Sequence, residues 1–92
     1  MTKASTVTVF IPTQLRNYTN GATQVPAEGA TVDAALTDLD RRYPGIRFRV
    51  VDEQNRIRQH MRIFVDGERV QAVSTNLATA TEVHVFGALS GG

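Results

Sequence analysis

The sequence contains no cysteine. This excludes disulfide bonds, thiolate metal sites and a cysteine nucleophile. It also contains no apolar run long enough to span a bilayer, and the amino end from Met1 to Thr6 lacks the apolar core of a signal peptide. We therefore expect a cytoplasmic protein that has no membrane partner.

The sequence also lacks a large excess of either positive or negative charge. Ten Lys and Arg residues stand against nine Asp and Glu, which gives a formal net charge of +1. This balance argues against a general nucleic-acid or membrane binder. The arginines are nevertheless concentrated in the middle of the chain, at Arg41, Arg42, Arg47, Arg49, Arg56, Arg58, Arg62 and Arg69. Two interpretations stay open, a solvated face and a docking surface for an acidic partner.

Motifs for catalysis or nucleotide binding are absent too. The chain has no G-x-x-x-x-G-K-[ST] phosphate loop and no clustered carboxylates that would hold Mg²⁺. His60 and His84 have no further ligand at zinc spacing. We predict that the chain is not an enzyme and binds neither a metal nor a cofactor itself.

Period-two alternation marks the first strand. Residues 6–11 alternate between two faces, with Val7, Val9 and Ile11 on one of them. Asn20-Gly21 indicates a turn, and residues 22–25 can return as a short strand that ends before Pro26. The opening segment is thus typical of a β-hairpin.

The clearest helix begins at Thr31, which can act as its N-cap. Apolar side chains then recur at spacings of three and four, at Val32, Ala35, Leu36, Leu39 and Tyr43. Pro44-Gly45 ends the helix. Its single apolar stripe must pack against another element, and we expect that element to be a sheet.

Two further strands follow the helix. Residues 61–66 alternate, Asp66-Gly67 indicates a hairpin leading to a brief edge strand at residues 68–70, and residues 82–86 form the last strand. Residues 46–55 show no clear period, and we expect Phe48, Val50 and Val51 there to be partly buried.

The order of these elements predicts an α+β fold, with one main helix packed on one face of a mixed sheet. We assign residues 1–86 to a single domain and residues 87–92 to a flexible tail. We expect the free protein to be a monomer.

The tail ends in Gly91-Gly92. Without Cβ atoms, this dipeptide can enter a narrow channel in extended form. The terminal carboxylate is ionised at neutral pH and is a poor electrophile, so it must be activated before a nucleophile can attack. Plain fraying of a chain end is the alternative explanation for such a dipeptide.

Four segments together resemble the ThiS/MoaD group of ubiquitin-like β-grasp sulfur carriers. They are "VTVFIPTQLR", "TVDAALTDLDRRYPGIR", "RIFVDGERV" and the end "GALSGG". The resemblance covers nearly the whole chain and is strongest to the subgroup that delivers sulfur for cysteine or specialised-metabolite synthesis. It implies a β-grasp fold, ATP-dependent adenylation of Gly92 by an E1-like partner enzyme, and a C-terminal thiocarboxylate that donates sulfur to a biosynthetic enzyme.

Alternation also predicts a partner-binding surface. Phe10, Phe64, His84 and Phe86 should lie on the sheet face opposite the helix, where a polar, solvated surface is the rule. We predict that these side chains, together with Leu89 in the tail, bind a partner. Alternatively, residues 46–58 cover this face and make the aromatic side chains ordinary packing.

Three other functions stay open. The chain could be the small subunit of molybdopterin synthase, with its tail inserted into a stable large subunit. It could be a ubiquitin-like modifier that is attached to lysines of target proteins through Gly92. It could also be a non-covalent interaction module in which the tail plays no part.

Overall fold

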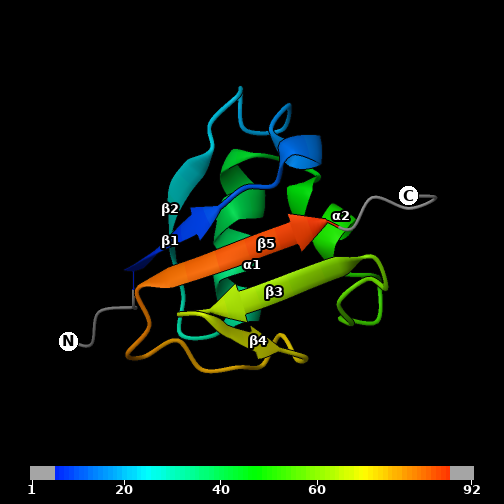
Figure 1. Ribbon diagram of the computed structural model, residues 1–92. Helices are drawn as coiled ribbons and strands as arrows, with labels where there is room; N and C mark the ends of the chain where they lie inside the picture. Colours follow the sequence, from blue (N-terminus) through cyan, green and yellow to red (C-terminus); the bar gives the residue numbers. More distant parts are fainter. Residues whose placement is uncertain (1–5, 88–92) are drawn as a thin grey trace.

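The structure is a computed structural model and describes residues 6–87. Its elements, in chain order, are β1 (Thr6–Phe10), the short 3₁₀ helix η1 (Thr13–Leu15), β2 (Gln24–Glu28), α1 (Val32–Arg42), α2 (Ile46–Val50), β3 (Met61–Val65), β4 (Glu68–Val70) and β5 (Glu82–Gly87). The five strands form one sheet in the order β2-β1-β5-β3-β4 (Figure 1). β1 and β5 run parallel and the other neighbouring pairs are antiparallel. The predicted mixed sheet and α+β class are therefore confirmed.

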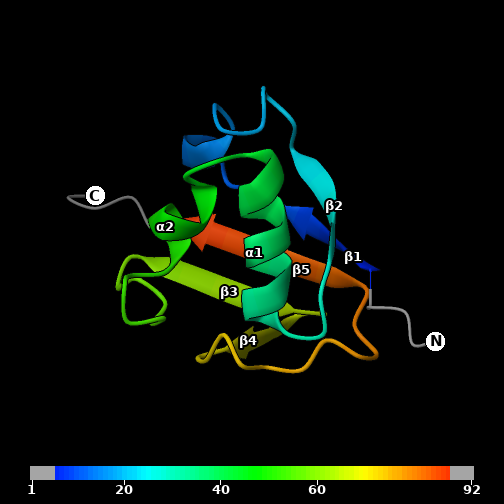
Figure 2. The same cartoon turned by 180° about the vertical axis from the view of Figure 1, so that it is seen from behind.

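Helix α1 crosses one face of this sheet, and α2 lies on the same side (Figure 2). The Oγ1 atom of Thr31 accepts a hydrogen bond from the Ala34 amide at 3.1 Å, which confirms the predicted N-cap. The predicted apolar stripe is buried at Val32, Ala35, Leu36 and Leu39. Tyr43 is the C-cap residue and is only partly buried against the core.

The sheet supplies the other half of the core through every second residue. Val7, Val9, Ile63, Val83 and Val85 are all buried beneath the helices, as alternation predicts. Successive side chains along a strand point to opposite faces of the sheet. The residues that precede and follow these buried ones therefore lie on its outer face.

The prediction that the second strand ends before Pro26 is wrong. β2 continues to Glu28, and Pro26 lies opposite Thr8 of β1. β2 is an edge strand. Proline is tolerated there because an edge residue whose nitrogen faces away from the sheet has no ladder hydrogen bond to donate.

Residues 46–50 form a short helix, which begins after Gly45 at φ +96°. Its geometry turns Ile46 and Val50 inward, and Val51 is buried as well. Phe48 lies on the opposite side of the helix and is 52% exposed, so the prediction that it is partly buried is wrong. In a helix, residues 46 and 50 lie on the same face and residue 48 lies on the opposite one. The sequence alone does not show that this segment is helical.

The start of β5 is tied to the hairpin between β3 and β4. Asp66 Oδ1 accepts hydrogen bonds from the Thr81 amide at 3.1 Å, the Thr81 hydroxyl at 3.1 Å and the Glu82 amide at 2.9 Å. The bond from the Glu82 amide, followed by that from Thr81, lowers the pKa of the Asp66 carboxyl. One side chain thus sets where the last strand begins.

β5 ends at Gly87, which lies opposite Met61. Gly87, assigned to the tail from the sequence, is therefore the last residue of the strand. Leu89, Gly91 and Gly92 lie outside the described residues. Within residues 6–87, no helix has the length and apolar character needed to cross a membrane.

Candidate partner-docking face

Four side chains predicted to bind a partner come together on the outer face of the sheet. His84 of β5 is the central residue, with Phe10 of β1 opposite it on one side and Phe64 of β3 opposite it on the other. Phe86 follows on the same face of β5, two residues further along. We call Phe10, Phe64, His84 and Phe86 the aromatic cluster.

The rings of the cluster contact one another directly. Phe10 and His84 are stacked, with centroids 4.1 Å apart and planes at 6°. Phe64 and Phe86 meet edge to face at 5.5 Å and 82°, and His84 and Phe86 lie 6.0 Å apart. Stacked and edge-to-face arrangements are both favourable for aromatic pairs. The four rings therefore form one continuous surface.

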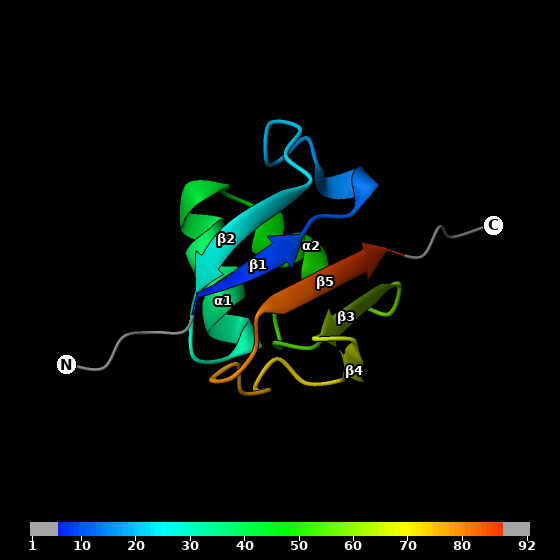
Figure 3. The ribbon, with the colours of Figure 1, turned by 60° about the vertical axis from the view of Figure 1, so that its left-hand side comes forward.

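This surface is open to solvent. Phe86 is 50% exposed, and the other three side chains are partly buried by their neighbours. Of the helices within residues 6–87, none lies in front of the sheet in Figure 1 or Figure 3, and α2 packs beside α1 behind it. Residues 46–58 therefore do not cover the aromatic cluster, and the packing alternative is wrong.

Polar groups lie at the edge of the cluster. His84 Nε2 lies 3.1 Å from Glu82 Oε1, so the imidazole is oriented by a carboxylate on its own strand. In the part of the chain that the structure describes, no group of three or more His, Asp or Glu residues is placed to hold a metal ion. The face has the character of a contact surface, with an aromatic centre and polar groups around it.

A shallow hollow of about 400 Å³ adjoins the cluster where β1 and β5 end. Phe10, His84 and Phe86 line one part of it, and Gln14 and Arg16 line another. A Cβ atom at Gly87 would clash with the side-chain amide of Gln14. Gln14 thus lies directly against the last residue of β5, a contact between distant segments that no sequence pattern indicates.

Two arginines share the outer face with the aromatic cluster. Arg62 lies opposite Phe86, and Arg69 of β4 lies opposite Phe64. The sequence identifies both as members of a basic region, but their position beside the aromatic cluster was missed. The alternation of β3 could have placed Arg62, since it precedes Phe64 by two residues.

The fold is that of a β-grasp domain, and comparisons with known proteins identify the family. The model of the ThiS family matches residues 9–92. The sulfur carrier protein CysO of Mycobacterium tuberculosis is 35% identical over 91 residues, which cover 94% of this chain and 98% of CysO. The chain belongs to the ThiS family.

Solved structures agree with this assignment. The crystal structure of Mycobacterium tuberculosis CysO aligns with a TM-score of 0.84 at 34% identity, covering 90% of this chain and 99% of that one. A chain of the Amycolatopsis orientalis BexX/CysO complex aligns at 0.85 and 32% identity, covering 94% and 99%. SAMP1 of Haloferax volcanii, at 24% identity and a TM-score of 0.78 over 96% of this chain and 100% of SAMP1, shares the fold.

Proposed function

We propose that this chain is a sulfur carrier, which holds sulfur as a thiocarboxylate on Gly92 and delivers it to a biosynthetic enzyme. The observation that carries the proposal is the similarity to CysO, a sulfur carrier protein, over 94% of this chain. The match of the ThiS family model extends to residue 92 and so includes both terminal glycines.

The chemistry requires activation of the carboxylate. The Gly92 carboxylate attacks the α-phosphorus of ATP, which releases pyrophosphate and forms an acyl-adenylate. A sulfide donor then attacks the carbonyl carbon, the bond from this carbon to the AMP oxygen breaks, and a thiocarboxylate remains. The thiocarboxylate sulfur then attacks an electrophilic carbon of the acceptor substrate and displaces a leaving group from it, which gives a thioester. Hydrolysis at the carbonyl carbon breaks the bond from this carbon to sulfur, releases the sulfur with the product as a thiol and restores the carboxylate.

The chain itself supplies the carried group and a docking surface. Its sequence has no phosphate loop, so an E1-like enzyme must bind ATP and perform the adenylation. The aromatic cluster and the hollow beside Gln14 adjoin Gly87, the last residue of β5. A partner that docks on this face is therefore close to the point from which the chain continues towards Gly92.

Intact-mass spectrometry tests the proposal. The protein is incubated with ATP, the E1-like enzyme of its host and a sulfide source, and reactions without ATP serve as the control. We expect a mass gain equal to the exchange of one oxygen for one sulfur, only when ATP is present. An unchanged mass, with an enzyme that loads another carrier under the same conditions, would contradict the proposal.

The aromatic cluster provides a test of docking. We expect Phe86→Ala to raise the Kd for the activating enzyme at least about tenfold, because exposed aromatic side chains are frequent hot spots of interfaces. Phe64→Ala should weaken binding too, through direct contact and through the loss of the ring that supports Phe86.

Phe48→Ala is the matched control for Phe86→Ala, since Phe48 is 52% exposed but lies on α2, away from the cluster. Titration calorimetry with each folded variant gives the Kd. Equal affinities for Phe86→Ala, Phe48→Ala and the unmodified protein would remove the docking role from the aromatic cluster.

A further inference from the structure

The arginines in the middle of the chain fall into two groups. Those in the first group have carboxylate partners: Arg41 and Arg42 pair with Asp38, Arg47 with Asp33, and Arg56 with Asp52. Those in the second group, Arg49, Arg58, Arg62 and Arg69, make no ion pair with any residue in the range 6–87. Half of the arginines in this region are thus paired with carboxylates within the described residues, and half are not.

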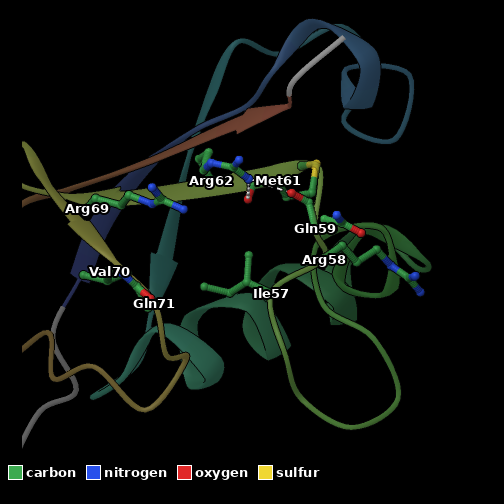
Figure 4. A pocket seen from close by; sticks show the side chains of 8 residues that line it. All are labelled: Ile57, Arg58, Gln59, Met61, Arg62, Arg69, Val70 and Gln71. Atoms are coloured by element: carbon green, nitrogen blue, oxygen red, sulfur yellow. Dashed lines mark hydrogen bonds between the residues drawn. The ribbon is translucent and has the colours of Figure 1, made fainter. Parts of the chain in front are cut away.

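Three arginines of the second group line one hollow of about 300 Å³. Arg62 extends from β3 and Arg69 from β4, whereas the side chain of Arg58, in the loop before β3, points away from the apolar side chain of Ile57 (Figure 4). Arg62 and Arg69 are diagonal neighbours on adjacent strands, since Arg69 is paired with Phe64. At that separation two like charges repel each other unless an anionic group lies between or above them.

The contacts of these arginines leave their charge uncompensated. Arg62 Nη1 donates to the carbonyl oxygens of Gln59 at 2.6 Å and Met61 at 2.9 Å. Arg58 Nε donates to the carbonyl oxygen of Phe48 at 2.7 Å, and its guanidinium stacks on the Phe48 ring. Neutral carbonyl oxygens orient a guanidinium and do not cancel its charge. The side chain of Arg69 makes no hydrogen bond to the described residues.

Arg62 and Arg69 are continuous with the aromatic cluster. Arg62 lies opposite Phe86 and Arg69 opposite Phe64, so one surface carries an aromatic half next to a basic half. Arginine presents several donors in a planar fork, which matches a carboxylate in a bidentate manner. The basic half is therefore suited to Asp and Glu side chains at the rim of an interface whose centre is aromatic.

We propose that Arg62 and Arg69 bind an acidic segment of the activating enzyme, while the aromatic cluster contacts an apolar area beside it. This inference rests on the proposed sulfur-carrier function and names the chemistry of the partner at the same face. Charge complementarity of this kind acts mainly on the rate of encounter. Reversal of one charge therefore weakens docking and leaves the adenylation step itself unchanged.

The experiment measures sulfur loading at increasing concentrations of the carrier, with Arg69→Glu, Arg62→Glu and the double variant. Arg41→Glu is the control, because it makes the same change of charge at a 73% exposed side chain on α1, behind the sheet. We expect the half-saturating concentration to rise roughly tenfold or more for Arg69→Glu and further for the double variant, with the maximal rate kept. Arg41→Glu should stay close to the unmodified protein.

Salt provides a second readout. Between about 0.01 M and about 1 M salt the screening length falls from about 30 Å to about 3 Å, so the half-saturating concentration of the unmodified carrier should rise steeply. The double variant should respond little. Equal changes of the half-saturating concentration for Arg69→Glu and Arg41→Glu, or the same salt dependence in all variants, would overturn this inference. The carrier function would still stand if the unmodified protein is loaded normally. No loading of the unmodified protein would instead overturn the proposed function and this inference with it.

Discussion

Removal of Gly92 is expected to abolish sulfur loading. The truncated chain ends in the carboxylate of Gly91, which is one residue short of the original position, or about 3.5 Å in extended form. Displacement of a reacting group by about 1 Å can cost about 100-fold in rate, so a carboxylate that stops short of the ATP site should not react at a detectable rate. Docking should persist, because the aromatic cluster is unchanged.

Intact-mass spectrometry and titration calorimetry separate these two effects. The matched control is Ser90→Ala, which alters the same segment and keeps both its length and its terminal glycine. We expect normal loading of Ser90→Ala, and binding without loading for the truncated chain. Loading of the truncated chain at the rate of the unmodified protein would contradict the assignment of the Gly92 carboxylate as the carried group.

The second large effect concerns the fold. Leu39 is 1% exposed on the face of α1 that covers the sheet. Leu39→Ala leaves a cavity at this site, and such substitutions cost about 2–5 kcal/mol of the free energy of unfolding. That is a large share of the roughly 5–15 kcal/mol that stabilises an ordinary domain.

Thermal unfolding followed by circular dichroism measures this loss. For a domain of this size we expect the Tm of Leu39→Ala to fall by about 10 °C or more, since each kcal/mol corresponds to roughly 4–8 °C. Thr37→Ala, on the exposed side of the same helix, should stay within about 0.5 kcal/mol. Equal Tm values for the two variants would contradict the packing of α1 against the sheet.

Local patterns predicted most of the fold. Alternation in β1, β3 and β5 is strict because one face of each strand is buried, so Phe10, Phe64, His84 and Phe86 could be assigned to one face before their contacts were known. The start and end of α1 were predicted because a capping threonine and Pro44-Gly45 act on their immediate neighbours.

Other features depend on contacts between distant segments, which no short pattern encodes. Pro26 stays within β2 only because that strand lies at the edge of the sheet, a matter of strand order. Phe48 is exposed because residues 46–50 form a short helix, and their mixed sequence does not distinguish a helical period from that of a strand. The contact of Gln14 with Gly87 joins η1 to the end of β5.

The aromatic cluster and the terminal glycines were predicted from two different kinds of evidence. The aromatic cluster follows from strand alternation, whereas the role that we propose for Gly91 and Gly92 follows from the resemblance to sulfur carriers, since a Gly-Gly dipeptide by itself is also typical of a frayed chain end. The match to the ThiS family now supports that resemblance over residues 9–92. The position of Arg62 and Arg69 beside the aromatic cluster could be recognised only from the sequence and the strand pairing together.

The most direct test of the carrier function locates the sulfur within the loaded protein. The protein is loaded with ATP, the activating enzyme and sulfide, then cleaved with trypsin, and the peptide that follows Arg69 is fragmented in a mass spectrometer. We predict that the exchange of one oxygen for one sulfur is confined to fragments that contain Gly92. Sulfur on fragments without Gly92, or a Gly92 joined to a lysine of another protein and never carrying sulfur, would contradict the account.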